Sequence, residues 1–159
     1  RPAGQAPYRR SRLSSNVRPH GRHHGVHSAA ALLEASLNLN TARVFVRDIA
    51  QAREFYANKL GLKVKAESQA QGYCVFSSGN CELVVESVAP DAPPDEQALV
   101  GRFTGLSFLV PSVHVTHQDL VSKGVVFTGA PERQFWGGTL ATFSDPEGNE
   151  FQVVHRDAA

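Results

Sequence analysis

The chain of 159 residues is 42% hydrophobic and 19% charged, which provides enough apolar residues for the core of one domain. It has no run of eighteen apolar residues, which excludes a membrane-spanning helix, and its two cysteines are too few for a disulfide scaffold. The net charge of +1 combines +5 in residues 1–40 with −4 in residues 41–159, and this mildly acidic body argues against nucleic-acid binding.

Residues 1–39 are predicted to be a disordered or non-native leader. They are rich in Arg, Ser, His, Ala and Pro and show no periodicity before Ala29, a composition that buries little apolar surface. The shortage of acidic residues also fits an organelle transit peptide, and translated sequence from upstream of the true start is a third interpretation. A fourth is a metal-binding cluster, because four of the seven histidines lie here: His20, His23, His24 and His27.

The body begins with the pattern of a strand, a helix and three more strands. Residues 41–47 are strand-like, and Asp48 follows as a helix N-cap with Gln51 at capping-box spacing. Apolar residues then recur at helical spacing up to Gly61, which is expected to end the helix: Ile49, Ala52, Tyr56 and Leu60. Strands are predicted at residues 62–67, 72–77 and 81–86, the last two joined by a turn at residues 78–80.

The same order of elements repeats in the second half. A strand begins at Gly105, Ser112 caps a helix that Gly124 closes, and strands follow at residues 125–128, 139–144 and 150–155. Asp48 and Ser112 are 64 positions apart, and Gly61 and Gly124 are 63 apart. A βαβββ unit that recurs at nearly constant offset predicts two modules, residues 40–87 and 102–155, joined by a linker rich in Pro and acidic residues at 88–101.

The two cysteines are expected to be reduced. Cys74 and Cys81 fall on adjacent predicted strands, but a turn at Ser78-Gly79 would pair position 74 with position 83. Partly buried free thiols are typical of a cytoplasmic protein.

Two segments carry a family resemblance. Residues 44–62 contain VFVRDI followed by FY and LGL, and residues 136–149 contain WGG followed by ATFSDPEGN. In this order, within a duplicated βαβββ unit, they resemble the vicinal oxygen chelate superfamily, which includes glyoxalase I, bleomycin- and fosfomycin-resistance proteins and extradiol dioxygenases. The resemblance implies an α+β domain over residues 40–155, in which the two modules form a curved mixed sheet around a cup with the helices outside.

Metal enzymes of this superfamily hold a divalent ion in the cup through a His on each module's first strand and a Glu on each last strand. Carried over to this chain, the first-strand positions are Thr41 and Gly105. The last-strand positions are Gln152 and Leu83, or Glu82 if the register shifts by one. Because Gly lacks a donor atom and Thr is a poor ligand for a divalent ion, we expect no metal and no cofactor in the cup.

Strand alternation predicts which side chains face the cup. From Thr41 the same face carries Arg43 and Phe45, with Leu83 on the last strand of the first module; in the second module the residues are Gly105, Ser107, Glu150 and Gln152. Arg43 is expected either to pair with Glu150 or to grip an anionic ligand group. Trp136 lies in the long loop that borders the cup by family resemblance, where it either contacts a ligand or packs over a hairpin.

Three histidines of the body have no predicted catalytic role. His114 and His117 are neighbours on the second helix, outside the cup, and are expected to be one surface and one partly buried side chain. His155 faces away from Gln152, near the edge of the sheet.

The resulting hypothesis is a cytoplasmic protein that binds a small organic molecule in the cup without a metal, as bleomycin-resistance proteins sequester an antibiotic. The alternatives are a metal-dependent lyase, isomerase or dioxygenase with displaced ligands, and an interaction module whose cup is filled by side chains. The resemblance also implies a homodimer, and neither nucleic acid nor a membrane is an expected partner.

The leader hypothesis is tested by deleting residues 1–39. We expect the melting temperature to stay nearly unchanged, because the predicted core begins at the strand of residues 41–47. A large drop in the melting temperature would show that the leader packs on the domain.

Overall fold

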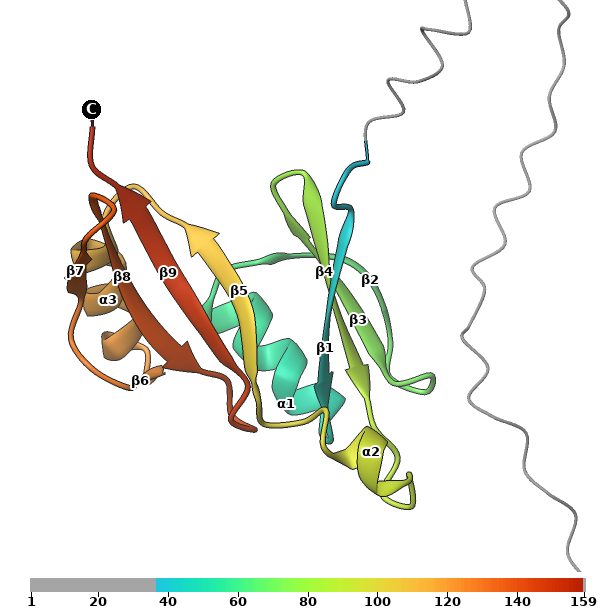
Figure 1. Ribbon diagram of the computed structural model, residues 1–159. Coiled ribbons are helices and arrows are strands. Elements are labelled where there is room, and N and C mark those ends of the chain that lie inside the picture. Colours follow the sequence, from blue (N-terminus) through green and yellow to red (C-terminus); the bar gives the residue numbers. More distant parts are fainter. Residues whose placement is uncertain (1–36, 159) are drawn as a thin grey trace, which may run out of the picture. The chain divides into compact units, whose positions relative to one another are not determined.

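The computed structural model describes residues 37–158, and the residues from Asn38 onward form one compact unit. Figure 1 shows its strands and helices. The first module comprises β1 (Thr41–Val46), α1 (Ile49–Glu54), which continues as a π-helical segment (Phe55–Lys59), β2 (Lys63–Ser68), β3 (Tyr73–Ser78) and β4 (Cys81–Ser87). After a short helix α2 (Pro94–Gln97), the second module comprises β5 (Phe103–Leu109), α3 (Val113–Ser122), β6 (Val126–Phe127), β7 (Glu132–Gln134), β8 (Gly138–Ser144) and β9 (Glu150–Arg156).

The predicted α+β architecture of two βαβββ modules is confirmed. The first sheet has the strand order β1-β4-β3-β2, and the second has the order β5-β9-β8-β6 with β7 added to β8. In each sheet the first strand of the module runs parallel to its last strand, and the other pairs are antiparallel. Helix α1 contacts β3 and β4, and α3 contacts β8 and β9, so both helices cover the same side of the strands (Figure 1).

The helix boundaries agree with the capping signals of the sequence. The Asp48 carboxylate accepts a hydrogen bond from the Gln51 N–H at 2.9 Å, and the Ser112 hydroxyl accepts one from the Val115 N–H at 3.3 Å. Gly61 follows the helical segment with a φ of +72°, a conformation that only glycine adopts without strain. No helix among residues 37–158 has the length and apolar character needed to cross a membrane.

One hydrophobic core serves both modules. The ring of Tyr56 on the π-helical segment lies 5.6 Å from that of Phe76 on β3 and 5.9 Å from that of Phe151 on β9, measured between centroids. All three side chains are fully buried. The chain of ring contacts continues from Phe151 to Phe143 on β8 at 5.6 Å, so the aromatic residues link the two sheets.

The turn between β8 and β9 ties the second module to the first. The Asn149 side-chain amide donates to the Phe45 carbonyl at 2.9 Å, and its oxygen accepts from the Gly101 N–H at 2.9 Å. The Glu147 carboxylate accepts from the backbone N–H groups of Arg47, at 2.7 Å, and Asp48, at 3.0 Å. These bonds satisfy backbone groups where β1 ends and β5 begins, so the turn fixes the first strand of each module.

A buried carboxylate lies at the centre of this turn. Asp145 accepts from the Tyr56 hydroxyl at 2.7 Å, from the Asn149 side-chain amide at 2.9 Å and from the Asn149 N–H at 2.9 Å. Burial, followed by the negative charge of Asp145, raises the pKa of Tyr56, so the phenol stays protonated and continues to donate. The network therefore connects the helical layer of the first module to the last hairpin of the second.

The structure corrects the predicted register of the β3–β4 hairpin. Ser78 pairs with Cys81, so the two-residue turn is Gly79-Asn80 rather than Ser78-Gly79, and Cys74 lies opposite Val85. The cause is the positive φ of +57° at Gly79, which begins the turn one residue later than expected. Both cysteines are free, and burial raises the pKa of Cys74 to about 11. The short elements α2 and β7 and the π-helical segment were not predicted from the sequence.

The tyrosine–aspartate bond between the modules is tested by Tyr56→Phe. We expect the free energy of unfolding to fall by about 2 kcal/mol, because a hydrogen bond to a buried carboxylate is lost while the ring remains. Chemical denaturation measures this change. Tyr73→Phe is the matched control, since the Tyr73 hydroxyl makes no hydrogen bond within residues 37–158. An equal effect of the two variants would contradict the assigned role.

Candidate functional site

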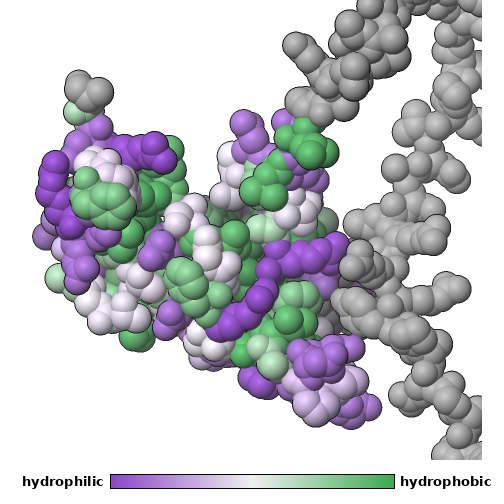
Figure 2. All heavy atoms as spheres, viewed as in Figure 1, coloured by the Kyte–Doolittle hydropathy of each residue, from purple (hydrophilic) through white to green (hydrophobic). Residues whose placement is uncertain are grey.

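The candidate site is the open face, defined as the side of the two sheets that α1 and α3 leave uncovered. Residues that are directly paired across strands share a face, so the sheet register identifies its members. On the first sheet it carries three rows, which are Thr41–Glu82–Ser77, Arg43–Val84–Val75 and Phe45–Glu86–Tyr73. Figure 2 shows this face hollowed between the two sheets, with hydrophilic and hydrophobic residues interspersed.

The charged side chains of the first sheet pair with one another. Arg43 forms an ion pair with Glu86, one row away on the adjacent strand, and Lys65 forms one with Glu82. Of the two predicted roles of Arg43, the contact with an anionic ligand group stays a prediction, whereas the pair with Glu150 is wrong. The reason is that β4, which carries Glu86, lies beside β1, whereas Glu150 lies on the second sheet.

The register also decides between the two candidates on β4. Glu82 lies opposite Thr41 on the open face. Leu83 points to the other side, is 3% exposed and belongs to the hydrophobic core, so it is not available to a ligand in the cup. The reason is the pairing with β1: Glu82 is the partner of Thr41, and because successive side chains of a strand alternate, Leu83 faces the core.

The second sheet presents mostly neutral side chains on the open face. Its central row is Ser107–Gln152–Thr142 across β5, β9 and β8. The Ser107 hydroxyl donates to the Gln152 side-chain oxygen at 3.3 Å, and the Gln152 amide donates to the Thr142 hydroxyl at 3.4 Å. The next row, Leu109–Val154–Leu140, is apolar, and the row on the other side is Phe103–Glu150–Ser144. This face thus combines hydrogen-bonding groups with a hydrophobic strip.

Gly105 interrupts the regular pairing of β5. The register between β5 and β9 shifts between Phe103 and Ser107, and Gly105 has a φ of +73°. The Thr104 hydroxyl donates to the Glu150 carbonyl at 2.7 Å and accepts from the Leu106 N–H at 3.1 Å, which replaces ladder bonds at the bulge. No side chain at position 105 reaches the open face, and the carboxylate of Glu150 makes no ion pair within residues 37–158.

Trp136 lies at one end of the open face of the second sheet. Its ring covers Gly138, where a Cβ atom would collide with it, and the Arg156 guanidinium carbon lies 5.9 Å from the ring centroid. The ring is 41% exposed, whereas that of the neighbouring Phe135 is 101% exposed. Trp136 therefore packs on the hairpin with part of its surface exposed, and its contact with a ligand stays a prediction.

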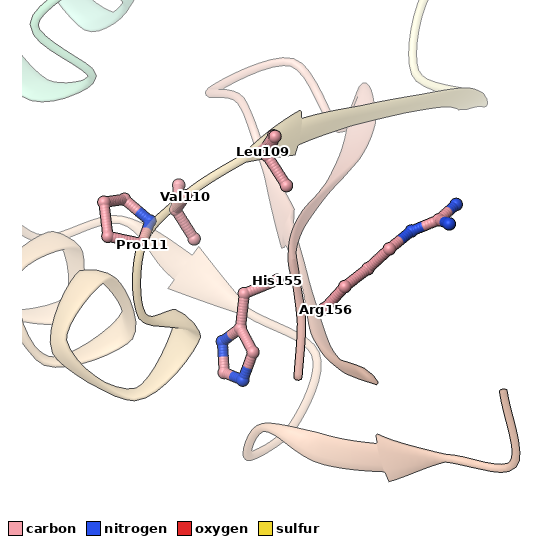
Figure 3. Close-up of a pocket in the computed structure, with 5 residues that line it drawn as sticks. All are labelled: Leu109, Val110, Pro111, His155 and Arg156. Atoms are coloured by element: carbon pink, nitrogen blue, oxygen red, sulfur yellow. The ribbon is translucent and has the colours of Figure 1, made fainter. Parts of the chain in front are cut away.

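Two of the cavities in the described part of the chain lie near the sheets. The larger, of about 590 Å³, is lined by Leu109, Val110, Pro111, His155 and Arg156 (Figure 3). The smaller, of about 330 Å³, lies between α1 and the β2–β3 hairpin, outside the cup, and includes the Arg53–Glu67 ion pair. None of the nine predicted site residues lines either cavity, but the larger one adjoins Trp136 through Arg156.

The histidines of the second module take structural positions. His155 accepts a hydrogen bond from the Val113 N–H at 2.8 Å through Nδ1 and so satisfies a free donor at the start of α3. His117 packs edge-on against Phe127 at 4.5 Å between centroids, and His114 is exposed. The contact between His155 and Val113 joins residues that are 42 positions apart in the sequence, so no local sequence pattern predicts it. The histidine cluster of residues 20–27 lies outside the described residues.

The residues present do not fit a divalent metal in the cup. Thr41 and Gly105 supply no anionic or imidazole donor, the amide of Gln152 is held by Ser107 and Thr142, and Glu82 is paired with Lys65. Within residues 37–158, no three His, Cys, Asp or Glu side chains gather at distances suited to a metal ion.

The fold and the open face define a class of protein, a duplicated βαβββ domain with one side of its sheets left uncovered by helices. A family model, the Glyoxalase/Bleomycin resistance protein/Dioxygenase superfamily, matches residues 38–153. The chain belongs to this superfamily.

The chain is also similar to individual bacterial proteins. The chain is 25% identical over 118 residues to the uncharacterized protein YetH of Bacillus subtilis, and the match covers 71% of this chain and 93% of YetH. Among solved structures, a superfamily member from Sphaerobacter thermophilus is 28% identical with a TM-score of 0.63, covering 74% of this chain and 96% of that one. TnmS3, an antibiotic-binding protein from Streptomyces sp. CB03234, is 26% identical with a TM-score of 0.63, covering 77% and 98%.

The donor chemistry predicts the metal content of the cup. Elemental analysis of protein purified without chelator or added metal is expected to find no stoichiometric zinc, iron, nickel or manganese bound there. About one ion per chain that is lost on Gln152→Ala or Glu82→Ala would contradict this expectation. An ion that both variants retain would belong to another part of the chain.

Proposed function

We propose that the chain is a metal-independent small-molecule-binding protein that sequesters an antibiotic or toxic metabolite on its open face. The proposal extends the superfamily membership to a specific role. Its proposed contacts are the predicted residues that border this face: Thr41, Arg43, Phe45, Gly105, Ser107, Trp136, Glu150 and Gln152. A cytoplasmic location and a homodimeric state are part of the same proposal.

The observation that carries the proposal is the neutral row Ser107–Gln152–Thr142. Gln152 in this row is one of the positions that correspond, by resemblance, to metal ligands of the superfamily. Its side chain is hydrogen-bonded to Ser107 and to Thr142. Beside it lies the apolar row Leu109–Val154–Leu140. Small-molecule sites combine apolar walls with a few polar groups that fix the orientation of the ligand, and these two rows supply that combination.

The relatives support binding rather than a particular reaction. TnmS3 is an antibiotic-binding protein, and the family model includes bleomycin-resistance proteins. Members of one fold differ in chemistry, so the proposal depends on the side chains of this chain's own open face. Those side chains include no combination of nucleophile and general base in hydrogen-bond contact among the described residues.

The proposal is tested by titrating the purified protein with a panel of antibiotics that includes bleomycin. Fluorescence follows binding, because Trp136 is the only tryptophan of the chain. We expect saturable binding of at least one compound that persists in the presence of a chelator. Binding that requires added metal, or turnover of the bound compound, would favour the enzyme alternative.

Trp136→Ala is expected to weaken binding of such a compound by about tenfold or more, because it removes a large apolar contact surface at the end of the face. Calorimetry measures the affinity of this variant, which lacks a fluorescent reporter. Phe135→Ala is the matched control, since this neighbouring aromatic side chain is fully exposed. Equal affinities of the two variants would remove Trp136 from the site.

A further inference from the structure

The larger cavity arises where β5 ends before β9 does. Leu109 is the last residue of β5 paired with β9, and one more backbone bond runs from the Val110 N–H to the Val154 carbonyl at 2.9 Å. Pro111 has no N–H to continue the ladder and directs the chain into α3. His155 and Arg156 of β9 therefore extend past the end of β5 and form one side of the cavity, opposite Leu109, Val110 and Pro111 (Figure 3).

The apolar side of this cavity is exposed. Leu109 is 77% exposed, and its cross-strand partner Val154 connects it to Leu140 in the apolar row of the open face. Residues two apart on a strand share a face, so Arg156 lies on the same face as Val154 and Leu109. The cavity thus combines a hydrophobic wall with one cationic side chain at its edge.

The guanidinium of Arg156 has no carboxylate partner in the described part of the chain. The arginines at positions 43, 47, 53 and 133 each form an ion pair. The adjacent acid, Asp157, is engaged by Arg133 at 2.6 Å. The described contact of the Arg156 guanidinium is with the face of Trp136, which holds it in position and leaves its charge uncompensated.

The other polar side chain of the cavity is already engaged. His155 binds the Val113 N–H through Nδ1, and Figure 3 shows its imidazole and the Arg156 guanidinium directed to opposite sides of β9. His155 therefore contributes to the wall, and Arg156 is the group available for an anion. A guanidinium presents a planar pair of N–H donors that matches a carboxylate.

We propose that this cavity binds an organic monoanion, a molecule with an apolar ring body and one carboxylate, with Leu109 contacting the body and Arg156 the carboxylate. The proposal rests on the proposed small-molecule binding and adds the chemical class of the ligand and the part of the open face that recognises it. A volume of about 590 Å³ accommodates such a molecule.

The test uses two probes with the same ring system, 2-naphthoate and the neutral 2-naphthalenemethanol, titrated by calorimetry into the full chain. We expect 2-naphthoate to bind about tenfold to a hundredfold tighter, because a charge-assisted hydrogen bond is available only to the carboxylate. Arg156→Gln should bind the two probes equally, and Leu109→Ser should weaken both. Both side chains are exposed, so we expect unchanged melting temperatures.

Arg102→Gln is the matched control, since Arg102 is also an exposed arginine without a carboxylate partner but precedes the opposite end of β5. It should retain the preference for 2-naphthoate. Equal binding of the two probes by the unmodified chain, no binding of either, or loss of the preference in Arg102→Gln would overturn the proposal. The proposed function can survive such a failure. It would still be supported by an antibiotic that the unmodified chain and Arg156→Gln bind with the same affinity.

Discussion

The buried hydrogen-bond network around Asp145 holds the two modules of this domain together. Each βαβββ module has its own sheet, and the isolated parallel bridge of β1, between Phe45 and Val100, reaches only the linker that precedes β5. The Asp145–Asn149 turn adds bonds to the end of β1, to the start of β5 and to Tyr56 in the helical layer. Because these groups are buried, loss of any partner leaves a desolvated polar atom, and this cost favours one arrangement of the sheets over others.

The open face depends on that arrangement. The helices cover one side of both sheets, so the other sides of β1 and β5 are left exposed with their polar and apolar rows. The first sheet neutralises its charges internally through the pairs Arg43–Glu86 and Lys65–Glu82. The second sheet carries the neutral and hydrophobic rows, and Arg156 is the cation at its edge without an acidic partner among the described residues. The two halves of the duplicated fold therefore have different surface chemistry, and the second module is the better suited to contact an organic molecule.

Membership of the superfamily does not determine the chemistry of this chain. By the resemblance, the four positions at which metal enzymes of the superfamily have ligands correspond here to Thr41, Gly105, Gln152 and Glu82. At Gly105 the backbone itself differs, because a bulge with positive φ replaces a regular strand residue. The chemistry of the open face therefore depends on this chain's own side chains.

The sequence by itself determined the duplicated α+β fold, the helix caps at Asp48 and Ser112 and the face of β1 that carries Arg43, because these follow from local periodicity, capping chemistry and a repeat at constant offset. It failed on β4, where carrying over the position that follows Gly79-Asn80 placed Leu83 instead of Glu82 on the open face. Only the tertiary structure decided the partner of Arg43, the hydrogen bond from Tyr56 to Asp145 and the cavity beside Arg156. Each of these joins segments that are distant in sequence. Whether such segments come into contact depends on strand order and packing, which local sequence patterns do not predict.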